Sequence, residues 1–163
     1  DVYYEIIRQK TATLIAACCE IGVLSNDADE ALAKKMMNFG TYTGMAFQIK
    51  DDLFDYLSSN VIGKPVGIDI KEQKMTLPLI HTLKMASEKE RKYYFNTIKR
   101  YNNDPKRVKE LIDFVKNSGG MDYAIKVMKD FQQKAKDILE EFPNSEARRS
   151  LHSMLDYVIE RKF

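Results

Sequence analysis

The chain has 163 residues, of which 44% are hydrophobic and 31% charged, so it is long enough for one globular domain with its own core and too apolar to be disordered. Its 26 basic and 24 acidic side chains are interleaved along the chain and leave a net charge of +2, which excludes a dense basic surface for nucleic acid. No apolar run approaches the roughly 20 residues that a membrane-spanning helix needs.

The two cysteines, Cys18 and Cys19, are adjacent and lie in a helical pattern, where they point in different directions. We interpret them as small core residues of a reducing compartment, and we expect a cytoplasmic protein. His81 and His152 stand far from any partner in the sequence, so a metal site of cysteine and histidine is not expected.

Apolar residues recur at spacings of three and four, and strict alternation is nowhere sustained, which predicts an all-α fold. The pattern and the capping residues predict helices over about 2–23, 28–58, 75–86, 88–101, 105–117, 120–141 and 144–162. Residues 59–74, "SNVIGKPVGIDIKEQK", form one long connection with two glycines and a proline. Connections of that length in a compact domain are usually functional.

The first predicted helix carries a charge on an apolar face. Lys10 shares this face with Ile7, Leu14, Ala17 and Ile21 at 100° per residue. Such a lysine either extends past its neighbours to solvent or binds an anionic group beside a cavity. The hydroxyl of the next residue, Thr11, is either a donor to a ligand or a partner of its own backbone.

The second predicted helix contains "FQIKDDLFDY", in which Asp51, Asp52 and Asp55 fall on one stripe with Gln48. Apolar residues cover about half of the circumference, and Lys50 is the one charge inside that apolar arc. Carboxylates so close together repel one another and need nearby cations. Mg²⁺ takes one or two carboxylates together with water and phosphate oxygens, so the stripe favours a Mg²⁺–phosphate site over the alternative, an acidic helix face in water.

The long connection carries further charges: Lys64 follows Gly63, and Asp69 and Lys74 come shortly after. Flexible lysines behind a metal-binding helix are able to close over phosphates, although they are equally compatible with a solvated loop.

Three segments in this order resemble the C-terminal half of trans-isoprenyl diphosphate synthases, especially the octaprenyl-type polyprenyl members: "KTATLIAACCEIG", "FGTYTGMAFQIKDDLFD" and "GKPVGIDIKEQKMTLPLI". The resemblance is clear over residues 1–80, and beyond them only the helical pattern continues. It implies a helical bundle of the isoprenoid synthase type, usually homodimeric, that joins an allylic diphosphate to isopentenyl diphosphate with the help of Mg²⁺.

The resemblance also implies roles for particular residues. Asp51, Asp52 and Asp55 match the second aspartate-rich motif, with Asp51 and Asp55 as the direct Mg²⁺ ligands and Asp52 further from the metal. The remaining matches bind substrate: Lys10 binds the allylic diphosphate, Thr11 and Gln48 lie near the reacting carbon, Lys64 reaches the diphosphate, and Asp69 and Lys74 organise closure of the loop.

The family pairs two aspartate-rich motifs, whereas the only Asp-Asp pair in this chain is Asp51–Asp52. We therefore expect residues 1–163 to be the C-terminal part of a single all-α domain, inactive alone, with the first motif and the residues that set product length upstream. Two alternatives stay open: a non-catalytic helical subunit or interaction module, and a lyase similar to terpene cyclases.

Overall fold

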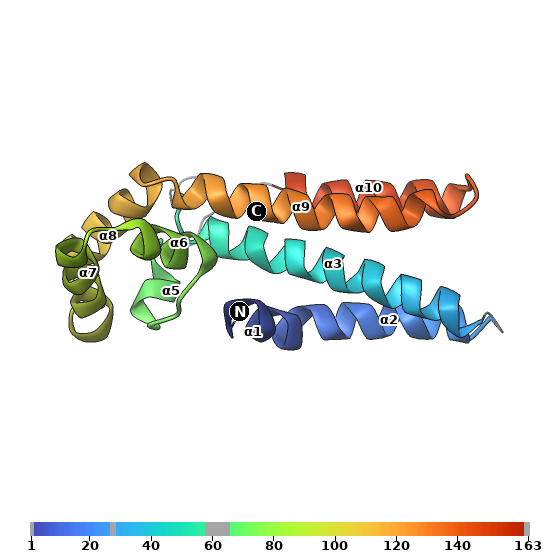
Figure 1. The fold of residues 1–163 in the computed structure, drawn as a ribbon, viewed down its shortest axis with the longest axis horizontal. Coiled ribbons are helices and arrows are strands. Elements are labelled where there is room, and N and C mark those ends of the chain that lie inside the picture. Colours follow the sequence, from blue (N-terminus) through green and yellow to red (C-terminus); the bar gives the residue numbers. More distant parts are fainter. Residues whose placement is uncertain (1, 27–28, 58–65, 162–163) are drawn as a thin grey trace. The chain divides into compact units, whose positions relative to one another are not determined.

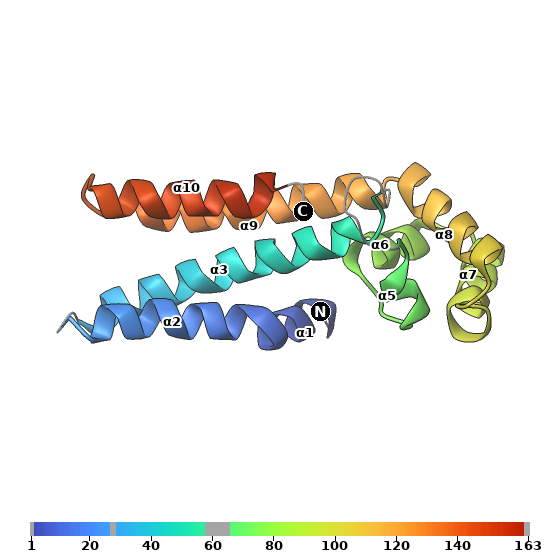
Figure 2. The same ribbon diagram turned by 180° about the vertical axis from the view of Figure 1, so that it is seen from behind.

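The computed structural model describes residues 2–26, 29–57 and 66–161, and over these ranges it contains helices and no strand (Figures 1 and 2). This confirms the all-α prediction. The helical elements, in chain order, are α1 (Val2–Ile7), a π-helical turn η1 (Arg8–Ala12), α2 (Thr13–Leu24), α3 (Glu30–Phe54), α5 (Ile68–Lys71), α6 (Leu77–Met85), α7 (Glu88–Arg100), α8 (Pro105–Asn117), α9 (Gly120–Glu140) and α10 (Glu146–Glu160).

Most of the predicted helices agree with these bounds to within a few residues, but three local predictions need correction. The helix expected over 2–23 is interrupted by η1, whose wider turn adds a residue that a helical wheel does not count. Helix α3 ends at Phe54, before the predicted end at 58. The connection expected over 59–74 contains the short helix α5, and its residues 59–65 lie outside the described ranges.

Side-chain caps explain where several helices begin. Ser87 starts α7 with a capping box, in which its hydroxyl accepts from the Glu90 amide and the Glu90 carboxylate accepts from the Ser87 amide. Asp104, which precedes Pro105, accepts from the amides of Lys106 and Arg107 at the start of α8. Ser145 caps α10. Each cap satisfies amides that have no partner within their own helix.

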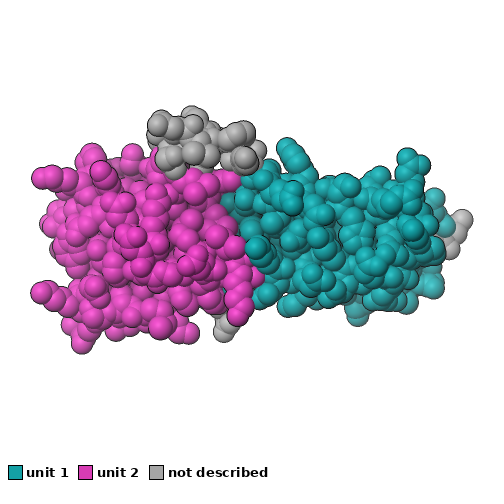
Figure 3. Space-filling view, turned by 90° about the horizontal axis from the view of Figure 1, so that it is seen from above, with its two compact units in different colours: residues 1–50, 127–161 teal, residues 51–126, 162–163 magenta. Residues whose placement is uncertain are grey.

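The chain packs as two compact units, which Figure 3 colours teal and magenta. Unit 1 comprises residues 1–50 and 127–161, and unit 2 comprises residues 51–126 with 162–163. Helices α3 and α9 contribute residues to both. That residues 1–163 belong to a single domain of a longer protein stays a prediction.

In unit 1, α2 runs antiparallel beside α3, and α9 runs antiparallel beside α10 (Figures 1 and 2). Side chains from all four helices form its core, in which Phe39, Ala135 and Leu155 are fully buried. Gly40 allows α3 to approach α2 closely, because a Cβ at this position would lie 2.7 Å from the Cα of Ala16. This contact needs glycine, since real Cβ atoms do not approach other atoms so closely.

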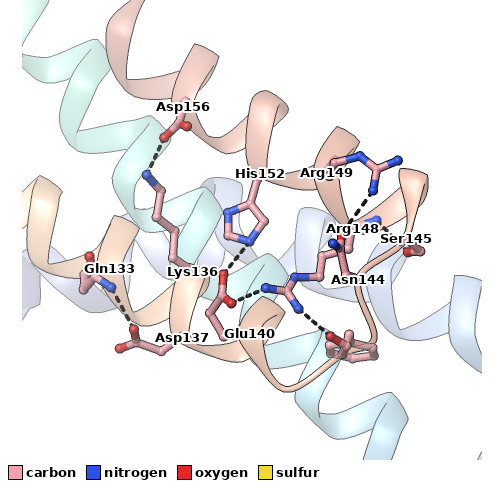
Figure 4. Close-up of polar contacts among 11 residues, drawn as sticks. Gln133, Lys136, Asp137, Glu140, Asn144, Ser145, Arg148, Arg149, His152 and Asp156 are labelled. Atoms are coloured by element: carbon pink, nitrogen blue, oxygen red, sulfur yellow. Dashed lines mark hydrogen bonds and ion pairs between the residues drawn. The ribbon is translucent and has the colours of Figure 1, made fainter.

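Polar side chains tie α9 to α10 at the surface of unit 1 (Figure 4). The Glu140 carboxylate pairs with Arg148 and lies 3.0 Å from the Nε2 atom of His152. One turn earlier in α9, the Lys136 ammonium lies 2.6 Å from an oxygen of Asp156. Most of these side chains are partly exposed, so the pairs align the two helices more than they stabilise the fold.

Unit 2 has its own core, which α5, α6, α7 and α8 share with Tyr56 at the exit of α3. Its fully buried members are Tyr56, Ile70, Leu79, Leu111 and Val115. In neither unit is any described helix long and apolar enough to cross a membrane.

Candidate functional site

The predicted site residues divide between the two units. Lys10, Thr11 and Gln48 lie in unit 1, whereas Asp51, Asp52, Asp55 and Lys74 lie in unit 2. Lys64 lies outside the described residues.

In unit 1, Thr11 and Gln48 are in direct contact although they are 37 positions apart in the sequence. The Thr11 hydroxyl donates a 2.8 Å hydrogen bond to the side-chain oxygen of Gln48. Gln48 is buried, with 8% of its surface exposed, and Thr11 is half-buried. The hydroxyl thus binds a neighbouring side chain, a partner that is neither of the two that the sequence left open for Thr11.

Two backbone features bring this pair together. The π-helical turn η1 carries both Lys10 and Thr11, and such turns often occur at functional sites. Opposite it, Gly44 faces Ala12 so closely that a Cβ on Gly44 would lie 2.5 Å from the Ala12 Cα. The two glycines of "GTYTG" were the available sequence signal for this close approach, whereas nothing in the sequence pattern predicted the π-helical turn.

Lys10 is exposed, and the residues of its predicted apolar face differ widely in how far they are buried. Ile7 is buried, with 3% of its surface exposed, whereas Leu14 and Ile21 expose 71% and 63%. The extra residue of η1 shifts the helical register between Ile7 and Leu14, so the simple wheel mixed two faces. The ammonium of Lys10 is accessible to an anionic group.

A second cation, Arg161, lies beside Phe47, the neighbour of Gln48 in the sequence, and was not predicted from the sequence. The Arg161 guanidinium lies 4.0 Å from the ring centroid of Phe47, a cation–π contact within unit 1. Partial burial, followed by the charge of Arg161, lowers the pKa of Lys50. Lys50 therefore belongs to a cationic pair, a relationship that no local pattern indicates because 111 positions separate the two residues.

In unit 2, Asp55 lies just past the end of α3 and binds the backbone that begins α5. Its carboxylate accepts hydrogen bonds from the amides of Ile68, at 2.8 Å, and Asp69, at 3.2 Å. Its carbonyl oxygen accepts a third, at 3.0 Å, from the amide of Gly67. Asp55 directly follows Phe54, the last residue of α3, and that its side chain shares the stripe of Asp51 stays a prediction.

The environment of Asp55 disfavours its charged form. Burial, and next the charge of Asp69, raise the pKa of the Asp55 carboxyl from 3.8 to about 6, although the hydrogen bonds from the backbone amides oppose this. A carboxylate under such repulsion gains from a nearby cation.

Three acidic side chains of unit 2 lie near the hydroxyl of Tyr56. Its hydroxyl lies 2.6 Å from that of Thr76, and its ring is fully buried. Burial is the main cause that raises the pKa of Tyr56, and the charges of Asp55, Asp52 and Asp69 raise it further. These three carboxylates therefore share one neighbourhood around a buried hydroxyl, and Asp52 is itself buried, with 6% of its surface exposed.

The carboxylate oxygens near Tyr56 are ligands that a hard cation prefers, but they do not form a closed cage around one. No group of three or more His, Cys, Asp or Glu side chains is arranged to hold a metal ion within residues 2–26, 29–57 and 66–161. Mg²⁺ does not need such a group, because it binds one or two carboxylates and completes its shell with water and phosphate oxygens.

Lys74 points back toward α5. Its ammonium lies 2.5 Å from an oxygen of Glu72 and 3.4 Å from one of Asp69, and the hydrogen bond to Glu72 is the main cause that raises the pKa of Lys74. The half-exposed lysine is held beside Asp69, and its role in organising this segment stays a prediction.

A surface hollow of about 550 Å³ lies elsewhere in unit 1, between the end of α2 and the start of α3. Glu20, Leu24, Glu30, Lys34 and Met37 are among the residues that line it. None of the predicted site residues is among them, so the hollow does not belong to the candidate site.

Comparison with known proteins agrees with the resemblance. The sequence model of the family described as Polyprenyl synthetase matches residues 1–115. A short chain isoprenyl diphosphate synthase of Methanothermobacter thermautotrophicus is 38% identical over 163 residues, which are 99% of this chain and 50% of that protein. Component 2 of the heptaprenyl diphosphate synthase of Bacillus subtilis is 34% identical over 99% of this chain and 45% of its own length.

The fold is also similar to that of a solved structure, a polyprenyl synthase from Caulobacter crescentus complexed with calcium and isoprenyl diphosphate. The TM-score is 0.91 and the identity 32%, over 99% of this chain and 50% of that one. The chain thus spans about half the length of the relatives it matches. It belongs to the polyprenyl synthetase family.

Proposed function

We propose that the whole protein is a prenyltransferase that condenses an allylic diphosphate with isopentenyl diphosphate into a longer trans-polyprenyl diphosphate. The C1–O bond of the allylic substrate breaks and diphosphate leaves with the bonding electrons. The double bond of isopentenyl diphosphate attacks C1, and loss of a proton restores a double bond. Family membership supports this proposal, together with the presence of residues that match each motif of the family's C-terminal half.

The hydrogen bond between Thr11 and Gln48 is the observation that carries the proposal. The resemblance assigns both side chains to the neighbourhood of the reacting carbon, and the structure joins them directly. Beside them, Lys10 is exposed and able to bind the diphosphate of the allylic substrate as a fixed positive charge. The oxygens of Thr11 and Gln48 would orient the allylic carbons and stabilise the positive charge that develops there.

In unit 2, Asp51, Asp52 and Asp55 are proposed as the acidic set for Mg²⁺. When bound, Mg²⁺ would neutralise the charge that develops on the departing diphosphate. Lys64 and Lys74 are proposed to add positive charge on the substrate side. The calcium and isoprenyl diphosphate in the Caulobacter structure support the use of a divalent cation in this family.

Three further proposals concern the whole protein. Residues 1–163 form the C-terminal part of one all-α domain, since relatives of this chain are about twice as long. The resemblance supports a homodimer. The Bacillus relative, by contrast, is named as component 2 of a heptaprenyl diphosphate synthase. The free thiols of Cys18 and Cys19 support a cytoplasmic location.

Steady-state assays of the full-length protein with allylic and isopentenyl diphosphates and Mg²⁺ test the proposal. Asp51→Asn should lower kcat/KM by about 100-fold or more, because a fixed charge near the leaving group is lost. Asp113→Asn is the matched control, since it removes an exposed carboxylate from α8 of the same unit. Absence of turnover by the wild-type protein would overturn the proposal. If Mg²⁺-dependent diphosphate binding were also absent, the protein would be a non-catalytic helical subunit.

A further inference from the structure

Both oxygens of the Asp55 carboxylate accept hydrogen bonds from backbone amides. Oδ1 accepts from Ile68 and Oδ2 accepts from Asp69, so the two oxygens hold the amides of the first two residues of α5. A carboxylate that binds two amides of one turn fixes the position and the direction of that turn. It retains lone pairs, but the orientation of its plane is determined by the amides.

The backbone around Asp55 reinforces this arrangement. The amide of Gly67 donates to the Asp55 carbonyl, and Gly67 has a positive φ of 78°. A Cβ at Gly67 would lie 2.9 Å from a methyl carbon of Val108, so this turn also packs tightly against α8. On the other side, the Asp55 backbone continues into fully buried Tyr56. The start of α5 is therefore held between α8 and the exit of α3.

Asp69 is the residue whose place depends most on this contact. Its amide donates to Asp55, its carbonyl accepts from the Lys74 amide at 2.8 Å, and its carboxylate pairs with the Lys74 ammonium. The side chain of Asp69 exposes 22% of its surface, so it is accessible to a ligand. A change at Asp55 would therefore reach Asp69 and Lys74 through α5.

We propose that Asp55 is a positioning residue, which sets the place of Asp69 and Lys74 by clasping the first turn of α5 and acts on the bound metal through them. The inference rests on the proposed function and deepens it: within the acidic set proposed for Mg²⁺, Asp55 holds α5 in place and does not contact the cation directly. It gives the third aspartate of "DDLFD" a task different from that of Asp51.

Amide hydrogen exchange of the 163-residue chain without metal or substrate tests the clasp. Asp55→Ala should speed exchange at the Ile68 and Asp69 amides by about 10- to 100-fold, the effect of losing a hydrogen bond to a charged group. Asp51→Ala should leave both amides as in the wild type. The Ile112 amide in α8 reports whether each variant is folded. Unchanged exchange at Ile68 and Asp69 in a folded Asp55→Ala protein would overturn the proposal.

Asp55→Asn provides the conservative variant. Its single amide oxygen can accept from only one of the Ile68 and Asp69 amides, because the NH₂ group is a donor. Fast exchange is therefore expected at one of the two amides and not at both. This variant also decides the question should Asp55→Ala fail to fold, because unchanged exchange at both amides would contradict the clasp.

A titration with Mn²⁺ in the presence of inorganic diphosphate separates positioning from direct metal binding. A clasp predicts that Asp55→Asn binds Mn²⁺ more tightly than Asp55→Ala, because half of the contact is restored. A direct ligand predicts equal loss in both variants, since both lose the charge, and that result would overturn the proposal. If the wild-type chain bound no Mn²⁺ under these conditions, the proposed function would fail for this chain, and the exchange experiment alone would decide the clasp.

Discussion

The hydroxyl of Thr11 donates a 2.8 Å hydrogen bond to the buried side-chain oxygen of Gln48, across 37 positions of sequence. The contact joins the π-helical turn η1 to the C-terminal part of α3, and we propose that both residues lie near the reacting carbon. It links the local geometry of unit 1 to the proposed chemistry.

The contribution of this contact to stability can be measured with a double-mutant cycle. We expect Thr11→Val and Gln48→Met to show a coupling of about 1 kcal/mol, the net value of a hydrogen bond between neutral groups. Urea unfolding of the two single variants and the double variant gives the coupling. Thr13→Val is the control, since its exposed hydroxyl binds only the Arg8 carbonyl and should show no coupling to Gln48.

Gly44 and Gly22 should respond in opposite ways to alanine. Gly44→Ala places a Cβ against the Ala12 backbone and should destabilise the chain by about 1–3 kcal/mol, the usual cost of overpacking. Gly22→Ala meets nothing within 4 Å in α2 and should stabilise by about 0.5–1 kcal/mol through helix propensity. Thermal and urea unfolding measure both values, and equal effects would contradict the close contact of α3 with η1.

Asp55 should make the stability of the metal-free chain depend on pH. Its folded pKa of about 6 lies above the ordinary value of 3.8, so the fold favours the protonated carboxyl. The resulting stabilisation is complete below about pH 4 and is lost as the pH rises through 6.

Other groups titrate over the same range, so the comparison must be made with Asp55→Asn. Between pH 4 and 6.5 the free energy of unfolding of the wild type should fall relative to that of the variant, as measured by urea unfolding followed by circular dichroism. Parallel pH profiles would show that Asp55 has an ordinary pKa.

The exposed and buried apolar residues of unit 1 should tolerate substitution very differently. Ile21→Gln changes a side chain that is 63% exposed and should alter the free energy of unfolding by no more than about 0.5 kcal/mol. Phe39→Ala empties a fully buried position and should cost about 3–5 kcal/mol. A large loss of stability in Ile21→Gln would show that this face of α2 is covered in the chain.

The helical class and most helix bounds could be predicted from the sequence, because apolar spacing and caps act over a few residues. Ser87, Asp104 and Ser145 bind amides only two or three positions away, so their effect is visible in a short window. The aspartates of "DDLFD" and the lysine of "KTATL" could likewise be singled out, because charges in an apolar pattern are costly unless they have a task.

The relationships between distant residues were decided only by the tertiary structure. The contact of Thr11 with Gln48 depends on the extra residue of η1 and on the close packing at Gly44, and helical periodicity describes neither. The sequence pattern placed Asp55 on the stripe of Asp51 and gave no sign of its hydrogen-bond partners. Its carboxylate binds amides 13 and 14 positions later, because a partly buried backbone turn satisfies its donors with the acceptor that the packed chain brings near.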